Sequence, residues 1–247
     1  MIRQSEEHDS GWGMAAYEYA DGGEPRLVRF PEAAYADGDF RRATSFEGRI
    51  FNVHVRRATM GGLTMANTHP FCLDSYSFSH NGTVLQFASL LEPGVCEPRG
   101  ETDSEHVFNF LMRDLDPGDV PGSLRRVVTS VVERSAFSGI NVLFSDGARL
   151  YAYRLGIFEL RWLARSDRLM VASEEITDER WHAVGQDVLL TLDPRDLTAP
   201  RSERLVGDSV LARARIEKFE AGTGLRGSER GAFAAQRAAQ LASSPPG

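Results

Sequence analysis

Short polar clusters between residues 52 and 105 bring together an arginine, an Asn-Gly pair and an aspartate that are typical of a binding site. Arg56 and Arg57 close the apolar run 50–55, and His80-Asn81-Gly82 closes a run in which aromatic residues alternate with serine. Alternation at period two is typical of strands, and Asn-Gly directly after it indicates a turn. Strands that end in polar turns at one rim of a sheet commonly form a site there, so we expect a binding rim.

The residue types at this rim suit recognition of a carboxylate and stabilisation of an oxyanion. The guanidinium of Arg56 can hold a carboxylate through two parallel hydrogen bonds, which a lysine cannot do. The amide of Asn81 and the backbone N–H of Gly82 can stabilise an oxyanion, each by roughly 3 kcal/mol. Taken one at a time, these residues have plainer alternatives: a surface ion pair for Arg56, a helix cap for Asp103 and an ordinary turn for Asn81-Gly82.

Three histidines near the rim, His54, His69 and His80, raise the question of a metal site. Their spacing matches no compact zinc pattern, and no cysteine or carboxylate completes one. We therefore expect no metal and interpret all three as structural histidines hydrogen-bonded behind the site. No phosphate loop, dinucleotide fingerprint or Gly-x-Ser-x-Gly elbow is present, so we expect no cofactor.

Composition favours one globular domain. The 247 residues are 42% hydrophobic and 26% charged, enough for a substantial core. The net charge of −7 argues against a nucleic-acid partner, because nucleic acids are bound by basic surfaces. No apolar run is long enough to span a bilayer, and the polar start is unlike a signal peptide, so we expect a cytoplasmic protein without a membrane partner. Two cysteines, Cys72 and Cys96, give no disulfide framework.

The predicted elements come as strands, then helices, then strands. Asp21-Gly22-Gly23 predicts a hairpin between runs 11–20 and 26–30, and Asp146-Gly147 predicts another between runs 140–144 and 149–154. Apolar spacing predicts helices over 104–115 and 124–132, separated by a break at 116–122. Further strands are expected at 157–163, 169–173 and 187–192. Separate runs of strands and helices argue for α+β layers.

The carboxyl-terminal segment differs in composition from the rest. We expect the main domain over residues 1–207 and an Ala/Arg-rich tail over 208–247, helical at 210–220 and 228–242, with a frayed end. A surface helix and a homodimer contact are the two structural options for this tail.

Taken together, the motifs resemble the glutaminase domain of class II glutamine amidotransferases, in the N-terminal-nucleophile hydrolase superfamily. The resemblance runs from about Gln4 to about Asp193, and the nearest branch is that of stand-alone amidohydrolase-like members. Any single motif is weak, but their shared order is specific. The motifs are Gln4 to Gly13, His54-Val-Arg-Arg-Ala-Thr59 with Gly61, Asn67-Thr-His-Pro70, His80-Asn-Gly82, Thr102-Asp-Ser-Glu105, Ser145 to Tyr153 and Val171-Ala-Ser-Glu174.

The resemblance implies a fold and a site. The fold is a four-layer αββα sandwich of two antiparallel sheets between helical layers. Arg56 is expected to hold the α-carboxylate of glutamine and Asp103 its α-ammonium group, with Thr59 adding a contact. Asn81 and Gly82 are expected to act catalytically as the oxyanion hole. The implied partner is glutamine or a γ-glutamyl small molecule; the ammonia acceptor, or a separate protein that handles it, stays open.

The nucleophile of the family is a cysteine directly after the initiator methionine, whose freed α-amine can act as the base. This chain begins Met1-Ile2-Arg3, and neither Cys72 nor Cys96 is amino-terminal. We therefore expect a domain that is truncated relative to the family, lacks its first strand, and is inactive as given. The alternative is a non-catalytic glutamine- or γ-glutamyl-binding protein of the same fold.

Overall fold

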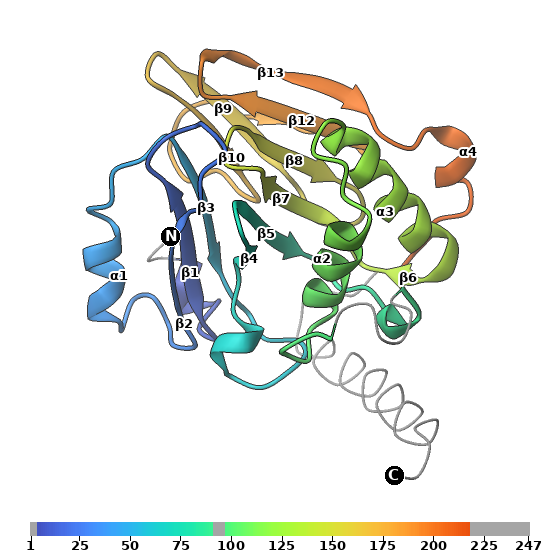
Figure 1. The fold of residues 1–247 in the computed structure, drawn as a ribbon, viewed down its shortest axis with the longest axis horizontal. Helices are drawn as coiled ribbons and strands as arrows, with labels where there is room; N and C mark the ends of the chain where they lie inside the picture. The colour runs from blue at the N-terminus through green and yellow to red at the C-terminus, as the bar shows by residue number, and fades with distance from the viewer. Residues whose placement is uncertain (1–3, 91–96, 218–247) are drawn as a thin grey trace.

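A computed structural model describes residues 4–90 and 97–217, and its strands form two stacked layers with helices outside them (Figure 1). The first sheet has the order β2-β1-β3 and contains β1 (Trp12–Tyr17), β2 (Arg26–Phe30) and β3 (Ile50–Val55), all antiparallel. The short helix α1 (Gly38–Ala43) covers its outer face, where the Phe40 ring packs edge-on against Trp12 at 5.0 Å.

The second layer is a six-stranded antiparallel sheet of order β13-β12-β8-β7-β5-β4. Alternation of buried and exposed side chains is weak in β5 and β7 because both faces of these central strands are covered. The strands are β4 (Phe71–Leu73), β5 (Tyr76–Asn81), β7 (Asn141–Ser145), β8 (Leu150–Arg154), β12 (Val188–Asp193) and β13 (Asp196–Arg204).

Two smaller groups of strands complete the fold. One is the three-stranded sheet β10-β9-β11, with β9 (Arg161–Arg165), β10 (Arg168–Ala172) and β11 (His182–Ala183). The other is the parallel pair of β6 (Ala136–Phe137) with β14 (Arg215–Ile216). In the described part of the chain, short 3-10 helices lie before β1 at Gln4–Glu6, between β3 and β4 at Met65–Asn67, and after β5 at Phe87–Leu90.

Two helices cover the outer face of the six-stranded sheet, and the main core lies beneath them. These are α2 (Asp103–Arg113) and α3 (Val120–Arg134), each with one apolar stripe. Their buried residues, such as Phe108 and Val131, pack with Phe78 and Phe144 of the sheet in one cluster. The α+β prediction and the four-layer αββα sandwich are thus confirmed.

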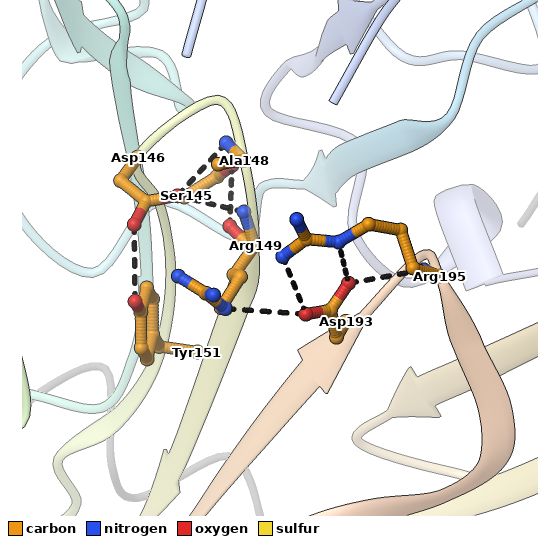
Figure 2. Close-up of polar contacts among 7 residues, drawn as sticks. All are labelled: Ser145, Asp146, Ala148, Arg149, Tyr151, Asp193 and Arg195. Carbon is orange, nitrogen blue, oxygen red and sulfur yellow. Dashed lines mark hydrogen bonds and ion pairs between the residues drawn. The ribbon is translucent and has the colours of Figure 1, made fainter. Parts of the chain in front are cut away.

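The hairpin between β7 and β8 formed where Asp146-Gly147 predicted it, and its turn is fixed by side chains. Figure 2 shows the Asp146 carboxylate accepting from the backbone N–H groups of Ala148 and Arg149 and from the Tyr151 hydroxyl, at 2.9, 2.7 and 3.0 Å. Arg149 also reaches Asp193 at the end of β12, at 3.4 Å. The two hairpin tips are therefore held together.

Two local predictions were wrong in their bounds, and one strand was missed. The break at 116–122 ends sooner than expected, because α3 begins at Val120 with Pro121 in its first turn and Asp119 as its cap. A proline in the first helical turn loses no hydrogen bond. The strand predicted at 157–163 lies at Arg161–Arg165 instead, and β13 was missed because its side chains are mostly exposed and polar.

The helix predicted at 210–220 was also wrong in its described part. Only α4 (Asp208–Leu211) is helical, and the chain then turns into β14. Arg213 forms an ion pair with Glu133 of α3 at 3.1 Å, and Val210 and Leu211 pack against the main core. The helix predicted at 228–242 lies outside the described residues.

Candidate functional site

One long pocket brings together all five residues predicted for the site. Its volume is about 1220 Å³, and Arg56, Thr59, Asn81, Gly82 and Asp103 all line it. They come from three places in the chain: the loop after β3, the end of β5 and the start of α2. The geometry thus agrees with the expectation of a polar rim, and we call this cavity the long pocket.

Arg56 is buried, with only 4% of its surface exposed, and it organises the loop that follows it. Its guanidinium donates to the carbonyl oxygens of Met60 at 2.7 Å and Gly62 at 3.1 Å. An arginine has five N–H donors, so three remain for a ligand. Burial lowers the pKa of Arg56, and the nearby Asp103 carboxylate opposes that shift.

Asn67 ties this loop to the start of α2. Its amide donates to the Gly62 carbonyl at 3.1 Å, and its oxygen accepts from the Glu101 N–H at 2.7 Å. A Cβ at Gly61 or Gly100 would lie 2.7 or 2.3 Å from the Asn67 amide, so both glycines are needed for this close approach. The Asn67-Thr-His-Pro70 motif therefore acts by positioning the loop.

Asp103 is buried at the first turn of α2, but it is not the helix cap that sequence reasoning offered as the alternative. Thr102 is the cap, with its side chain accepting from the Glu105 N–H. The Asp103 carboxylate instead accepts from the backbone N–H of Val84 at 2.7 Å. Burial raises the pKa of Asp103 above its usual range, while His80, 3.9 Å away, opposes the rise.

Asn81 and Gly82 lie where β5 ends, beside the paired residue Asn141 of β7. Gly82 has a φ of +150°, and a Cβ there would lie 2.0 Å from the carbonyl oxygen of Gly139. Only glycine fits this approach, which leaves the Asn81 side chain at the wall of the long pocket. The turn is thus fixed by packing against the chain before β7.

Of the three histidines predicted to be hydrogen-bonded through their rings, His80 agrees with the prediction, whereas His54 and His69 have ring nitrogens without a partner among the described residues. His80 contacts the Ser104 hydroxyl at 2.9 Å and the Gly139 carbonyl at 3.0 Å. Both ring nitrogens of His69 and Nδ1 of His54 have no partner among the described residues, so the prediction was wrong there. Their ring centroids lie 4.3 Å apart with the ring planes tilted by 33°, and burial lowers the pKa of His54 to about 3.

A metal site finds no support in residues 4–90 and 97–217, where no group of three histidine, cysteine or acidic side chains could hold an ion. Cys72 lies half-buried on β4, outside the long pocket, and burial raises the pKa of its thiol to about 12. Cys96 falls outside the described residues. In the same ranges, no helix is long and apolar enough to cross a bilayer.

Sequence reasoning missed several residues of the long pocket. Pocket residues from the second half of the chain, such as Asn141, Leu160 and Leu192, carry no motif of their own. Residues 168–174 also line it, and of these only the Val171 to Glu174 motif gave a signal. Their role follows only from the fold, which places β10 beside the pocket.

The stacked antiparallel sheets and their outer helices are those of the N-terminal-nucleophile hydrolases. A solved structure of this fold, glutamine phosphoribosylpyrophosphate amidotransferase from B. subtilis, superposes with a TM-score of 0.66. The match covers 84% of this chain and 46% of that one. Because the sequence identity is only 16%, the match shows a shared fold and not a shared activity.

The sequence profile of the class-II glutamine amidotransferases matches residues 2–167, and the chain belongs to this family. The protein MJ1515 of Methanocaldococcus jannaschii is 34% identical over 175 residues, which cover 66% of this chain and 48% of the relative. YafJ of Escherichia coli is 29% identical over 178 residues, covering 67% of this chain and 68% of YafJ. The chain thus spans about half the length of the first relative and about two thirds of the second.

Proposed function

We propose that the long pocket binds glutamine or a γ-glutamyl compound and supports hydrolysis of its side-chain amide. The observation that carries this proposal is a buried positive charge and a buried negative charge on the walls of one pocket. Within the described residues, Arg56 forms no ion pair, and the only ion-pair contact of Asp103 is to His80. Buried charges are costly unless they are paired, so a ligand with one carboxylate and one ammonium group is favoured.

The roles follow from this arrangement. Arg56 holds the α-carboxylate with its remaining donors, Asp103 accepts from the α-ammonium group, and Thr59 lies at the wall beside them. Burial raises the pKa of Asp103, and a bound ammonium group would oppose that rise by favouring the charged carboxylate. The side-chain amide then points toward Asn81 and Gly82.

In the reaction, water cleaves the amide C–N bond, the carbonyl carbon gains the hydroxyl, and ammonia leaves with the remaining proton. Asn81 and Gly82 stabilise the oxyanion formed on the carbonyl oxygen. The covalent route needs a thiol beside a free α-amine. Cys72 does not line the long pocket, so the 247-residue chain is proposed to bind the substrate without turning it over.

Calorimetry with matched ligands tests the binding proposal. Glutamine should bind, whereas the analogue without the α-amino group and the analogue without the α-carboxylate should each bind at least about tenfold more weakly, ~1.4 kcal/mol. Asp103→Asn should lower the affinity for glutamine while leaving that for the analogue without the amino group unchanged. We call Arg56 and Asp103 together the clamp. Equal affinities for all three ligands would contradict the roles proposed for these two residues.

The second candidate, a binding protein without chemistry, draws on one observation: no cysteine of the described residues lies in the long pocket. Both candidates predict binding of glutamine. They differ in ammonia release once a thiol is supplied at the Asn81 end, which only the first candidate predicts.

A further inference from the structure

Asp103 is a buried carboxylate that needs a counter-charge even before a ligand binds. Only 4% of its surface is exposed, and a buried charge without a partner is costly. In the part of the chain that the structure describes, its only ion-pair contact is with the ring of His80, whose Nδ1 lies 3.9 Å from Oδ2 of the carboxylate. The charge of His80 therefore bears directly on how Asp103 is stabilised in the ligand-free protein.

The hydrogen bonds of the His80 ring show which nitrogen must carry a proton. Nε2 lies 3.0 Å from the carbonyl oxygen of Gly139, which can only accept, so Nε2 carries a proton. Nδ1 lies 2.9 Å from the hydroxyl of Ser104, which can either donate or accept. The ring is neutral when Ser104 donates to Nδ1, and it is positively charged when Nδ1 donates to Ser104.

The hydroxyl of Ser104 lies between His80 and Asp103 and has a single proton to donate. Its oxygen is 3.5 Å from Oδ1 of Asp103, a longer approach than the 2.9 Å to His80. When His80 is neutral, the hydroxyl proton is used on Nδ1. When His80 is charged, Nδ1 donates to the hydroxyl, and the proton of Ser104 is free to turn toward Asp103. A charged ring thus stabilises the carboxylate through its charge and through the hydroxyl.

The two histidines on the β3 side of His80 stay neutral. Burial lowers the pKa of His54 to about 3 and holds the pKa of His69 well below the ordinary value of 6.5. Neither ring therefore carries a charge near pH 6. Arg56 is the cation on this side, and its charge and that of Asp103 favour each other without an ion-pair contact.

The other titratable groups at the start of α2 have backbone partners of their own. The carboxylate of Glu105 accepts from two backbone N–H groups of the loop before the helix, at 2.8 and 2.7 Å. The ring of His106 contacts a backbone carbonyl oxygen at 3.0 Å, and burial lowers its pKa. This leaves Asp103 as the acidic group of α2 that faces His80. Burial raises the pKa of Asp103, and the charge of His80 opposes that rise.

We propose that His80, acting through Ser104, is the internal partner of Asp103 in the ligand-free protein, and that the ammonium group of the ligand replaces it. Two cations beside one buried carboxylate would repel each other, so the ring becomes neutral as the ligand binds. Nδ1 of His80 then loses its proton to the solvent, and the ammonium group keeps its three. This rests on the proposed function, which supplies the ligand. His80 is a positioning residue, because it acts on the ligand through Asp103.

This exchange makes the site selective for ligands that carry an α-ammonium group. A ligand without that group leaves His80 charged and expels no proton. Because glutamine binding releases a proton, the affinity for glutamine should rise with pH over the range in which the ligand-free His80 is charged. Nε2 keeps its proton and its bond to Gly139 throughout, so the turn at Gly82, which packs on Gly139, is not disturbed.

Nitrogen NMR of the chain with nitrogen-15 in its histidines measures the exchange at the ring itself. The resonances of His80 are assigned by comparison with the His80→Gln variant. At pH 6.0 both ring nitrogens of His80 should carry protons in the ligand-free protein. Saturation with glutamine should remove the proton from Nδ1 only, and the analogue without the α-amino group should leave both protons in place. A neutral ring before binding, or a charged ring in the glutamine complex, would overturn the proposal.

Substitutions of Ser104 test the link between the two groups. Ser104→Ala should lower the fraction of charged His80 in the ligand-free protein, because Nδ1 loses its acceptor. Ser104→Thr keeps the hydroxyl and should retain the charge. An equal charge on His80 in the wild type and the Ser104→Ala variant would show that Ser104 does not link His80 to Asp103.

Calorimetry in two buffers of different ionisation enthalpy counts the protons and separates this proposal from the proposed function. Glutamine should release about one proton per chain at pH 6.0, and the analogue without the α-amino group none. If glutamine bound through Asp103 but released no more protons than the analogue, the exchange would be refuted and the binding proposal would stand. If glutamine did not bind, both would be refuted.

Discussion

At the scale of single residues, the proposed site depends on two buried side chains, Arg56 and Asp103, that are held in place by hydrogen bonds to nearby backbone groups. Arg56 uses two donors to hold the carbonyl oxygens of Met60 and Gly62 and keeps the others for a ligand. Asp103 is fixed by the Val84 N–H in the same way. Each residue is thus held in place before a ligand arrives, which reduces the entropy lost on binding.

Arg56→Lys should weaken glutamine binding by more than tenfold, ~1.4 kcal/mol or more, because a lysine cannot make the bidentate contact. Calorimetry measures the affinity, and Arg42→Lys, an exposed arginine on α1, serves as the control. The affinity for the analogue without the α-carboxylate should not change. If a folded Arg56→Lys variant bound glutamine normally, Arg56 would not be part of the site.

Burial of His54 and His69 should make stability depend on pH. Their pKa values lie below the ordinary 6.5 in the folded state, so the unfolded chain binds protons that the folded chain does not. Stability is therefore complete above about pH 6.5 and falls below it, by up to ~1.4 kcal/mol per pH unit for each histidine. Urea unfolding at pH 7.5 and 5.0 measures the loss.

His69→Phe should lower the number of protons taken up on unfolding by about one, and so flatten the dependence of stability on pH. His182→Phe, at an exposed position, serves as the control and should leave this dependence unchanged. An identical pH dependence in the wild type and the His69 variant would show that His69 does not titrate as its burial implies.

At the scale of elements, the site depends on how β5 ends. Gly82→Ala should destabilise the fold by roughly 2 kcal/mol or more, because a Cβ would meet the Gly139 carbonyl and φ is positive there. Gly38→Ala is the matched control, since nothing lies within 4 Å of a Cβ at that position of α1. Thermal unfolding of both variants gives the comparison, and equal melting temperatures would contradict the packing argument.

Sequence reasoning located the elements whose local signals agree with their tertiary setting. The hairpin at Asp146-Gly147 and α2 follow from turn chemistry and apolar spacing. It failed for β13, whose exposed polar side chains carry no alternation, and for residues 212–217, where pairing with β6 overrides helical propensity. The motifs named five residues that line one pocket, and their roles there stay a prediction. The hydrogen-bond partners of the histidines depend on long-range packing, which no local sequence pattern indicates.

At the scale of the whole molecule, the chain belongs to the class-II glutamine amidotransferases and has a pocket larger than the clamp needs. Residues of β3 and β10 line this pocket, and the two strands belong to separate sheets.

Ammonia release from glutamine tests the central claim most directly, namely that this is a glutaminase site in need of an amino-terminal thiol. The measurement compares the 247-residue chain with a chain extended at its amino terminus to begin with cysteine after methionine removal, and mass spectrometry locates the label left by a glutamine-like electrophile. We expect no release from the chain alone, and release from the extended chain with the label on its first cysteine. Release by the chain alone, or a label on Cys72 or Cys96, would contradict the account.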